Sequence, residues 1–311
     1  MLSFIVKRVL KGLLCVWFIW TLIFFLVRLT GDPTGWMLPD GATSAAVKEL
    51  REAMHLDEPL TKQYVDSLGD LLKGDAGRSY YYKQDVRKLY SERLQNTVRL
   101  AIPAFVVAII IGVSFGIIAA LKHNTIFDRV LMMITIIGHT MPSFCFGIIL
   151  IIIFSVQLGW LPTFGTGRGA DAWKHLVMPM LTLAWGPMSS IARLTRGSLL
   201  DVMTKEYIDG ARMKGLSERT VLIKHALRNS LIPVVTSVGT QIGNIISGAV
   251  VVETVFAWPG MGQMLVNSAK QRDFPTVQYG ILLVAFSVTF VNILVDVSYG
   301  FLNPKIRESF K

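Results

Sequence analysis

Polar side chains inside apolar segments are the residues of this sequence best placed to do chemistry. The apolar stretch 231–252 carries a set of small and polar residues spaced three or four apart: Ser237, Gln241, Asn244 and Gly248. This spacing puts all four on one face of a helix. His139 lies in another apolar stretch, three residues before Pro142, which we expect to break or kink the helix there. Polar groups in lipid must face protein or water, so we expect this face and His139 either to border water or to pack inside the protein.

Catalytic and nucleotide-binding motifs are absent from the sequence. It has no Gly-x-x-x-x-Gly-Lys-Ser/Thr phosphate loop, no His-Glu-x-x-His zinc motif and no Gly-x-Ser-x-Gly nucleophile elbow. The five histidines are scattered, and Cys15 and Cys145 both lie in apolar runs. We therefore expect no catalytic residues, no metal site, no disulfide framework and no ATP site on this chain.

The composition favours a membrane protein. Of the 311 residues, 52% are hydrophobic and 17% are charged, and the mean hydropathy is +0.51. Soluble chains are about 25% charged, so this balance disfavours a soluble globular protein and excludes a disordered one. The net charge of +10 is therefore read as a guide to membrane orientation, and not as a sign of nucleic-acid binding.

Six apolar stretches are long enough to suggest transmembrane helices, which need about 20 mostly apolar residues. They are 9–29, 100–121, 130–160, 176–192, 231–252 and 276–300. The fourth is short and contains Pro179 and Pro187. The first follows basic residues like a signal peptide, but its apolar run is long and no small-residue cleavage site follows it, so we expect a retained anchor. The predicted fold class is all-α, with six transmembrane helices.

The distribution of basic residues predicts that both termini are cytoplasmic. On that assumption the cytoplasmic pieces are 1–11, 122–129, 193–228 and 305–311, and they hold 16 basic and 6 acidic residues. The rest of the chain holds 15 of each. The whole positive excess therefore falls on the side where cytoplasmic loops carry it.

Two polar segments lie outside the apolar stretches. The external one, 30–97, has apolar residues spaced as in a helix after Thr43, at Ala46, Leu50, Met54 and Leu56. The internal one is predicted to be a helix over 198–214, a stop at Gly215 and a second helix capped by Ser217. Its charged residues surround small ones, which suits either a solvated connector or a helix that docks against another protein.

The internal segment also carries a family resemblance. Residues 206–215, Glu-Tyr-Ile-Asp-Gly-Ala-Arg-Met-Lys-Gly, resemble the cytoplasmic signature loop of ATP-binding-cassette (ABC) importer permeases. Asp209-Gly210-Ala211 stands where the short consensus has Glu-Ala-Ala, and the later proline is Pro233, as in the dipeptide, oligopeptide and nickel type. Six further motifs resemble the same type in order along the chain: 28–33, 56–60, 74–79, 159–162, 252–262 and 301–307.

The resemblance implies a permease subunit of the bacterial inner membrane that forms half of a translocation pathway. Its partners would be a second permease, two ATPase subunits that hold ATP and magnesium, and an extracytoplasmic binding protein; membrane lipid surrounds it, and no nucleic acid or cofactor binds. The expected substrates are peptides, with nickel, a metal chelate or glutathione as alternatives. An ion-gradient-driven secondary transporter is the alternative of a different class, for which midplane carboxylates and inverted repeats are the expected signs.

The resemblance gives the internal loop a coupling role, while polar spacing and position along the chain suggest roles for the other residues. The ATPase-coupling residues would be Glu206, Asp209, Gly210, Ala211, Arg212, Lys214 and Gly215. The translocation path would include Ser237, Gln241, Asn244, Gly248 and His139. The outer loop or gate would include Glu253, Trp258, Pro259 and Gly260, with Glu253 either bracing the loop or contacting substrate.

Two other features concern packing and organisation. Asp296 is expected to pair with Arg28 or with the partner permease. Gly112 and Gly116 have the spacing of a helix-packing motif. We expect three parts: a cytoplasmic segment and first transmembrane helix at 1–29, an extracytoplasmic segment at 30–97, and a five-helix permease core at 98–311 whose coupling loop is 193–230.

Overall fold

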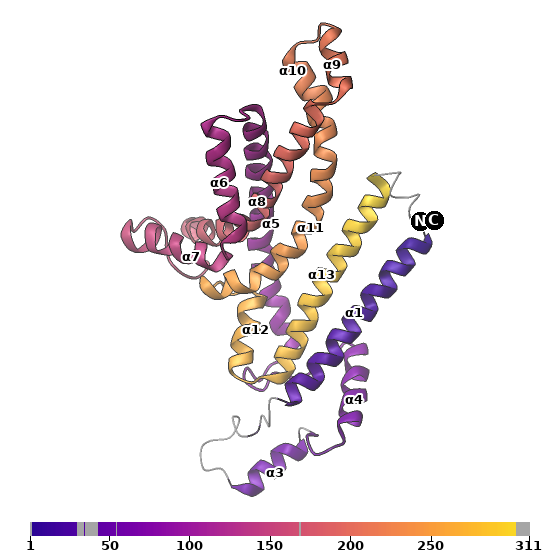
Figure 1. Cartoon of the computed structure of the whole chain (residues 1–311). Coiled ribbons are helices and arrows are strands. Elements are labelled where there is room, and N and C mark those ends of the chain that lie inside the picture. Colours follow the sequence, from indigo (N-terminus) through magenta and orange to yellow (C-terminus); the bar gives the residue numbers. More distant parts are fainter. Residues whose placement is uncertain (1, 30–33, 35–42, 54, 168, 303–311) are drawn as a thin grey trace. The chain divides into compact units, whose positions relative to one another are not determined.

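The computed structural model describes residues 2–29, 34, 43–53, 55–167 and 169–302 (Figure 1). Within these residues the protein is helical, and the only extended pairing is an isolated bridge between Arg78 and Asp85. The predicted turn at 31–33, Met54 and the motif residues 303–307 lie outside the described ranges. The all-α class is therefore confirmed for the described part of the chain.

Four helices are long and apolar enough to cross a membrane. They are α1 (Leu2–Leu29), α5 (Val86–Leu121), α11 (Arg228–Val255) and α13 (Phe274–Leu302). They contain the first, second, fifth and sixth predicted stretches. In α11 the apolar helical run starts earlier, at Glu218, because the helix continues without a break through a π-helical segment, η3 (Val221–Leu227).

The third predicted stretch is not one straight helix. α6 (Ile126–Thr140) is followed by α7 (Ser143–Leu150) and a π-helical segment, η1 (Ile151–Gln157), with a bend of 112° between them. Pro142 has no backbone N–H to continue α6, and Met141 before it is extended, with φ −77° and ψ 124°. Counting this bent pair as one span gives five candidate spans among the described residues.

The fourth predicted stretch lies inside α8 (Ala172–Met203), which continues through Pro179 and Pro187. By length and composition α8 is not among the candidate spans of the described residues. Its polar residues explain this, because Thr182, Ser189 and Thr195 are buried against neighbouring helices and need not face lipid. The predicted count of six is therefore not reached by apolarity alone.

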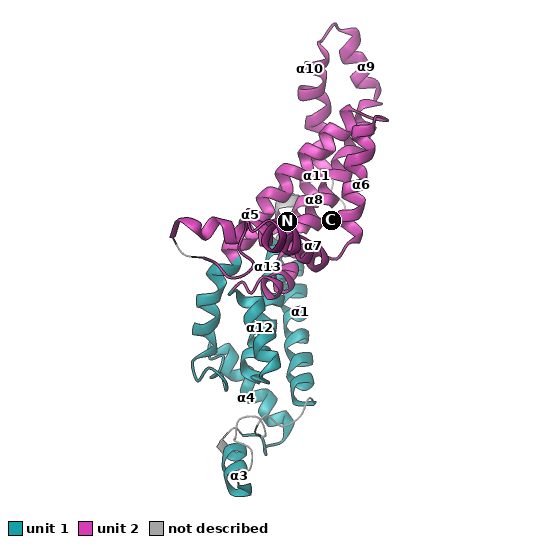
Figure 2. Ribbon diagram, turned by 90° about the vertical axis from the view of Figure 1, so that its left-hand side faces the viewer, with its two compact units in different colours: residues 1–97, 259–293, 310 teal, residues 98–258, 294–309, 311 magenta. Residues whose placement is uncertain are grey.

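The chain forms two compact units, coloured separately in Figure 2. Unit 1 comprises residues 1–97 and 259–293. It contains α1, α3 (Ser44–Ala53), α4 (Leu60–Leu72), α12 (Met261–Lys270) and the adjoining parts of α5 and α13. The predicted helix after Thr43 is present as α3, and the Thr43 hydroxyl accepts a hydrogen bond from the Ala46 N–H. One apolar core of this unit joins the start of α5 to α12 through Tyr90 and Met264.

Unit 2 comprises residues 98–258 and the chain from 294 onward. α8 packs against α6, α7 and α11. It also approaches α5 closely: a Cβ on Gly112 would lie 2.8 Å from the Met188 carbonyl oxygen, and one on Gly116 would lie 2.6 Å from that of Ala192. Only glycine allows such an approach, which confirms the predicted packing role of these two residues.

Candidate functional site: a helical hairpin, a polar helix face and an ion pair

The predicted coupling segment is a helical hairpin at one end of unit 2 (Figure 1). Its first half is not a single helix over 198–214: α8 ends at Met203, and α9 (Glu206–Met213) begins after a break at Thr204 and Lys205. The Thr204 hydroxyl donates to the Asp201 carbonyl, a local bond that competes with continuing the helix. Gly215 adopts φ +77°, which confirms the predicted stop.

The second half of the hairpin starts as predicted. The Ser217 hydroxyl oxygen accepts a hydrogen bond from the Thr220 N–H, which makes Ser217 the N-cap of α10 (Glu218–Thr220). Helical structure then continues through η3 into α11. The connection between α9 and α10 is therefore four residues long, and its geometry is set by one glycine and one capping serine.

One face of α9 belongs to the core of unit 2. Ile208 is fully buried and Ala211 nearly so, in a cluster with Ala120, Leu199, Val221 and Ala226. Arg212 bridges two carboxylates, with its Nη1 3.0 Å from Asp209 Oδ1 and its Nε 3.0 Å from Glu218 Oε1. Among the seven predicted coupling residues, Ala211 is thus buried, and Gly210 and Arg212 are partly covered. The other four are exposed: Glu206, Asp209, Lys214 and Gly215.

Outside this buried face, α9 leaves two large apolar side chains uncovered. Met213 is 83% exposed and Tyr207 is 47% exposed. Both belong to a hairpin whose other face is tightly packed. An apolar, partly charged surface held rigidly in this way is suited to docking against another protein.

The four residues of the predicted polar face on α11 do not share one environment. Gln241 is buried, and its Oε1 accepts a hydrogen bond of 2.9 Å from the Nδ2 of exposed Asn244. Ser237 is partly covered. A Cβ on Gly248 would lie 3.2 Å from Leu183, so Gly248 faces α8. The structure brings Gln241 and Asn244 together and places Gly248 at a helix contact.

His139 lies at the end of α6, directly before the 112° bend. It is exposed, and its Nδ1 lies 3.4 Å from the hydroxyl of Ser190 on α8. This placement does not match the alternative of a buried core histidine. The bend itself is packed from the α8 side, where Trp185 stacks on Phe146 of α7 at 3.9 Å between ring centroids.

The residues of the predicted outer loop fall in both units. In unit 2, Glu253 is fully buried, its backbone carbonyl accepts from the Trp258 N–H at 2.8 Å, and the Trp258 ring is 4% exposed. In unit 1, the Pro259 carbonyl accepts from Asn96 Nδ2 at 2.9 Å. Gly260 is buried and directly precedes α12. Burial at Glu253 fits the bracing role better than contact with a diffusing substrate.

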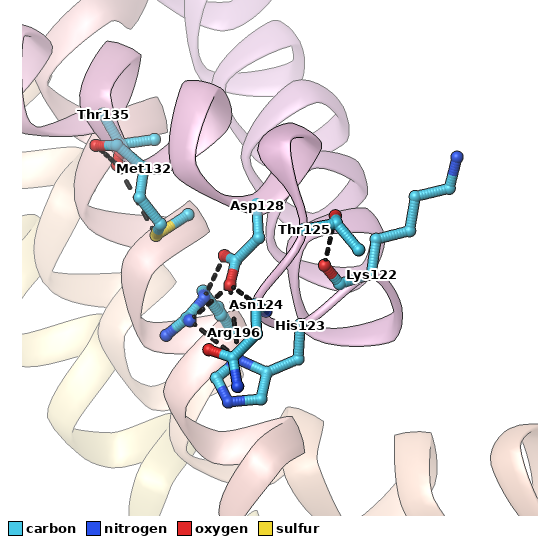
Figure 3. Close-up of polar contacts among 8 residues, drawn as sticks. All are labelled: Lys122, His123, Asn124, Thr125, Asp128, Met132, Thr135 and Arg196. Atoms are coloured by element: carbon cyan, nitrogen blue, oxygen red, sulfur yellow. Dashed lines mark hydrogen bonds and ion pairs between the residues drawn. The ribbon is translucent and has the colours of Figure 1, made fainter.

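An ion pair in unit 2 was missed by the sequence reasoning (Figure 3). Asp128 lies in the first turn of α6 and is 3% exposed. Arg196 donates to both of its carboxylate oxygens, from Nε to Oδ1 at 2.6 Å and from Nη2 to Oδ2 at 2.7 Å. The Asn124 N–H donates to Oδ2 at 3.0 Å, and His123 Nδ1 lies 3.3 Å from the same oxygen. No local signal predicts this pairing, because the two residues are 68 positions apart.

A second buried carboxylate, in unit 1, was also missed. Asp273 directly precedes α13 and is fully buried. Its oxygens accept hydrogen bonds from the Ser79 hydroxyl, the Tyr80 N–H and the Thr276 hydroxyl. The sequence Asp-Phe-Pro-Thr at 273–276 is a recognisable helix start, and this was the available signal.

Long apolar helices and a bent apolar helix pair are the features of an integral membrane protein. Among the described residues no group of three or more His, Cys, Asp or Glu side chains is placed to hold a metal ion. Residues 112–308 match the model of the binding-protein-dependent transport system inner membrane component, and residues 1–101 match the N-terminal model of such components. The chain belongs to this family, the inner-membrane permeases of ABC importers.

Curated relatives match over almost the whole chain. The glutathione transport system permease protein GsiC of Escherichia coli strain K12 is 41% identical over 308 residues, which is 99% of each chain. The protein of the same name from Escherichia coli strain CFT073 has the same identity and coverage. These relatives confirm the resemblance that the sequence motifs indicated.

Solved structures support the same fold. The MetNI methionine ABC transporter in inward-facing conformations gives a TM-score of 0.52 at 18% identity, covering 68% of this chain and 96% of that one. An amino acid ABC transporter with histidines gives 0.51 at 15% identity, covering 68% and 92%. At these identities the likeness concerns the fold alone.

Proposed function

We propose that the chain forms half of the translocation pathway of an ATP-driven importer of short peptides, with glutathione the first substrate to test. The observation that carries this proposal is the 41% identity to glutathione permeases over 99% of both chains. Glutathione is a tripeptide, so it falls within the class of peptides that the sequence motifs favoured. The peptide expectation and the glutathione alternative therefore converge on small peptides.

We further propose six membrane spans with both termini in the cytoplasm. The charge distribution along the sequence supports this orientation. α8 supplies the span that apolarity does not reveal: 32 residues extend about 48 Å, which exceeds the roughly 30 Å hydrocarbon core. Protein contacts on α8 allow its polar residues to lie at membrane depth. The division into an anchor, an extracytoplasmic segment 30–97 and a core from residue 98 belongs to the same proposal.

The hairpin is proposed to couple the permease to its ATPase. In this proposal α9 presents Tyr207 and Met213 to an ATPase subunit, while Ile208 and Ala211 hold the helix on the core. A second permease would complete the pathway, two ATPase subunits would bind ATP and magnesium, and an extracytoplasmic binding protein would deliver the peptide. The path residues on α11 and His139 keep their proposed role in contacting the pathway.

The first experiment is a mild-detergent pull-down of the tagged chain from its native membrane, with mass spectrometry of the proteins retained. We expect an ATPase and a second permease. The purified assembly is then placed in vesicles and supplied with ATP, binding protein and labelled glutathione or dipeptide. ATP-dependent uptake of either peptide supports the proposal, whereas uptake driven by an ion gradient without ATP refutes it.

A variant of the exposed hairpin face tests the coupling role. Met213→Glu places a charge at a side chain that is 83% exposed, so folding should be unaffected while uptake falls at least tenfold. Met213→Leu keeps an apolar surface and serves as the matched control. Gly215→Trp also tests this loop, but the φ of +77° at Gly215 means that any side chain there strains the backbone. Normal uptake by Met213→Glu would contradict docking through this face.

A further inference from the structure

Unit 1 contains a cavity of about 880 Å³. Its wall is formed by the end of α1, by α4 and the segment that follows it, and by the first turns of α13. The side chains that matter for its chemistry are those of Trp20, Arg28, Gln63, Tyr80 and Gln278. They come from three separate parts of the chain.

Arg28 is a cation in this wall that no carboxylate of the described residues neutralises. Its Nε donates to Gln63 Oε1 at 3.0 Å, and its Cζ lies 3.6 Å from the centroid of the Phe24 ring. No carboxylate of the described residues lies within 4.0 Å of its guanidinium nitrogens. A partly buried charge with no counter-charge is unfavourable, so a bound anion would stabilise it.

Other side chains that line the cavity are hydrogen-bond donors. The Tyr80 hydroxyl makes no hydrogen bond within the described residues, and burial raises the pKa of Tyr80 to about 12, which keeps the hydroxyl protonated at neutral pH. Trp20 and Gln278 are each 6% exposed, and Trp20 Nε1 and Gln278 Nε2 have no hydrogen-bond partner in the part of the chain that the structure describes. Unpaired buried donors are rare in folded proteins and call for an acceptor.

Of the four acidic side chains that line the cavity, three make close polar contacts and the fourth, Asp66, acts electrostatically on Lys62. Glu58 accepts from Lys62 at 2.8 Å, and the carboxylate of Asp70 lies 3.6 Å from Lys73. Asp75 accepts from the Gly77 N–H at 2.8 Å. The other cations of the lining, Arg51, Lys62 and Lys73, each pair with a carboxylate, so Arg28 is the lining cation that a bound anion would neutralise.

We propose that this cavity binds an anionic group, a carboxylate or a phosphate, through Arg28 and Tyr80. Resting on the proposed function, the anion is the terminal carboxylate of a short peptide held on the permease at the extracytoplasmic side. The phosphate of a phospholipid headgroup offers the same acceptor oxygens, and its binding is a separate outcome below. A guanidinium presents two N–H groups to one carboxylate or phosphate, which accounts for arginine at this position.

The test measures equilibrium binding to the purified assembly in nanodiscs, without nucleotide or binding protein. The probes are a labelled dipeptide with a free carboxyl terminus and the same dipeptide as its amide. Arg28→Gln should raise the Kd for the free acid about tenfold and leave that for the amide unchanged. Tyr80→Phe should raise the free-acid Kd about threefold. Lys48→Gln on α3 removes an exposed positive charge outside the cavity lining, so it is the control and should change neither.

A second arm identifies the source of the anion. Lipids retained by the assembly are measured by mass spectrometry after reconstitution with neutral lipid alone or with added phosphatidylglycerol. Anionic lipid retained by the wild type and lost in Arg28→Gln, with no effect on peptide binding, assigns the site to a headgroup phosphate. Melting temperatures of both variants show whether they fold. If Arg28→Gln does not fold, the binding of the free acid to Tyr80→Phe tests the site.

The two proposals fail separately. If wild-type vesicles import peptide and neither variant changes peptide binding or lipid retention, the anion site is refuted while the import function stands. If no peptide is imported, the proposed function fails. In that second case the anion site is tested with inorganic phosphate. A rise in the melting temperature of the wild type but not of Arg28→Gln supports the site, and the same change in both proteins refutes it.

Discussion

Asp128 and Arg196 form a two-pronged ion pair that ties the first turn of α6 to α8, with both N···O distances below 2.8 Å. Arg196 lies seven residues before the end of α8, and α9 follows after two further residues. The pair therefore holds α8 in place shortly before the chain enters the hairpin. Since Asp128 also accepts from the Asn124 N–H, it fixes the loop between α5 and α6 as well.

Removing the arginine should destabilise unit 2 strongly. Arg196→Gln leaves Asp128 buried without its counter-charge, so we expect the free energy of unfolding to fall by about 3 kcal/mol. The double variant Asp128→Asn/Arg196→Gln should lose less than Arg196→Gln alone, because no buried charge remains unpaired. Arg212→Gln breaks two pairs with exposed carboxylates, those of Asp209 and Glu218, and should cost less than about 1 kcal/mol. Thermal unfolding in detergent compares the variants; equal losses for Arg196→Gln and Arg212→Gln would contradict this account.

The contact between α5 and α8 should tolerate no side chain. Gly116→Ala places a methyl group 2.6 Å from the Ala192 carbonyl oxygen, so we expect a loss of about 1–3 kcal/mol in the free energy of unfolding. A Cβ on Gly197 of α8 would have no atom within 4 Å. Gly197→Ala should therefore be neutral or stabilise by up to about 1 kcal/mol through helix propensity. Opposite signs for these two glycine-to-alanine changes are the expected result in denaturant titrations.

The buried carboxylate of Asp273 should control the order of the segment around residue 79. Asp273→Ala leaves the buried Ser79 hydroxyl and the Tyr80 N–H without their acceptor, at a cost of at least about 2 kcal/mol. Hydrogen exchange of the amides at 77–82 should accelerate. Asp70→Ala, which loses only an exposed pairing with Lys73, is the control. Unchanged exchange in Asp273→Ala would show that this carboxylate does not hold the segment.

The phenol of Tyr80 should lose its proton at a higher pH than an exposed tyrosine does. Burial raises its pKa to about 12, against about 10 for a tyrosine in an unfolded chain. The folded state therefore keeps the proton that the unfolded state loses, and the stability due to Tyr80 is present below pH 10 and falls as the pH rises towards 12. Phenolate absorbance of wild type and Tyr80→Phe should coincide at pH 10 and separate only near pH 12. Separation already at pH 10 would mean that the phenol is open to solvent.

Local signals in the sequence predicted local structure well. Gly215 ends α9 and Ser217 caps α10, because the left-handed conformation and the capping bond each depend on a single residue. Pro142 predicted the place of the break in the third stretch for the same reason, although not its angle of 112°. The break at Thr204 was missed because no glycine or proline marks it.

Features set by packing were harder to predict. α8 is more polar than a lipid-facing helix, since residues such as Thr182 and Ser189 are buried by neighbouring helices rather than by lipid. The spacing on α11 correctly placed Gln241 and Asn244 together but could not tell that Gly248 would meet Leu183. The Asp128–Arg196 pair joins residues far apart in sequence, and one sequence carries no record of such a contact.

The cluster around Ile208 has a mechanical consequence. Ala120 of α5, Leu199 of α8, Val221 of η3 and Ile208 of α9 share one apolar core, and two and four residues connect α9 to its neighbours. These short connections and the shared core tie the hairpin to α5, α8 and η3, so a force applied at Met213 would act on all three. The side chains of this cluster, and not only the backbone, connect the hairpin to the helices.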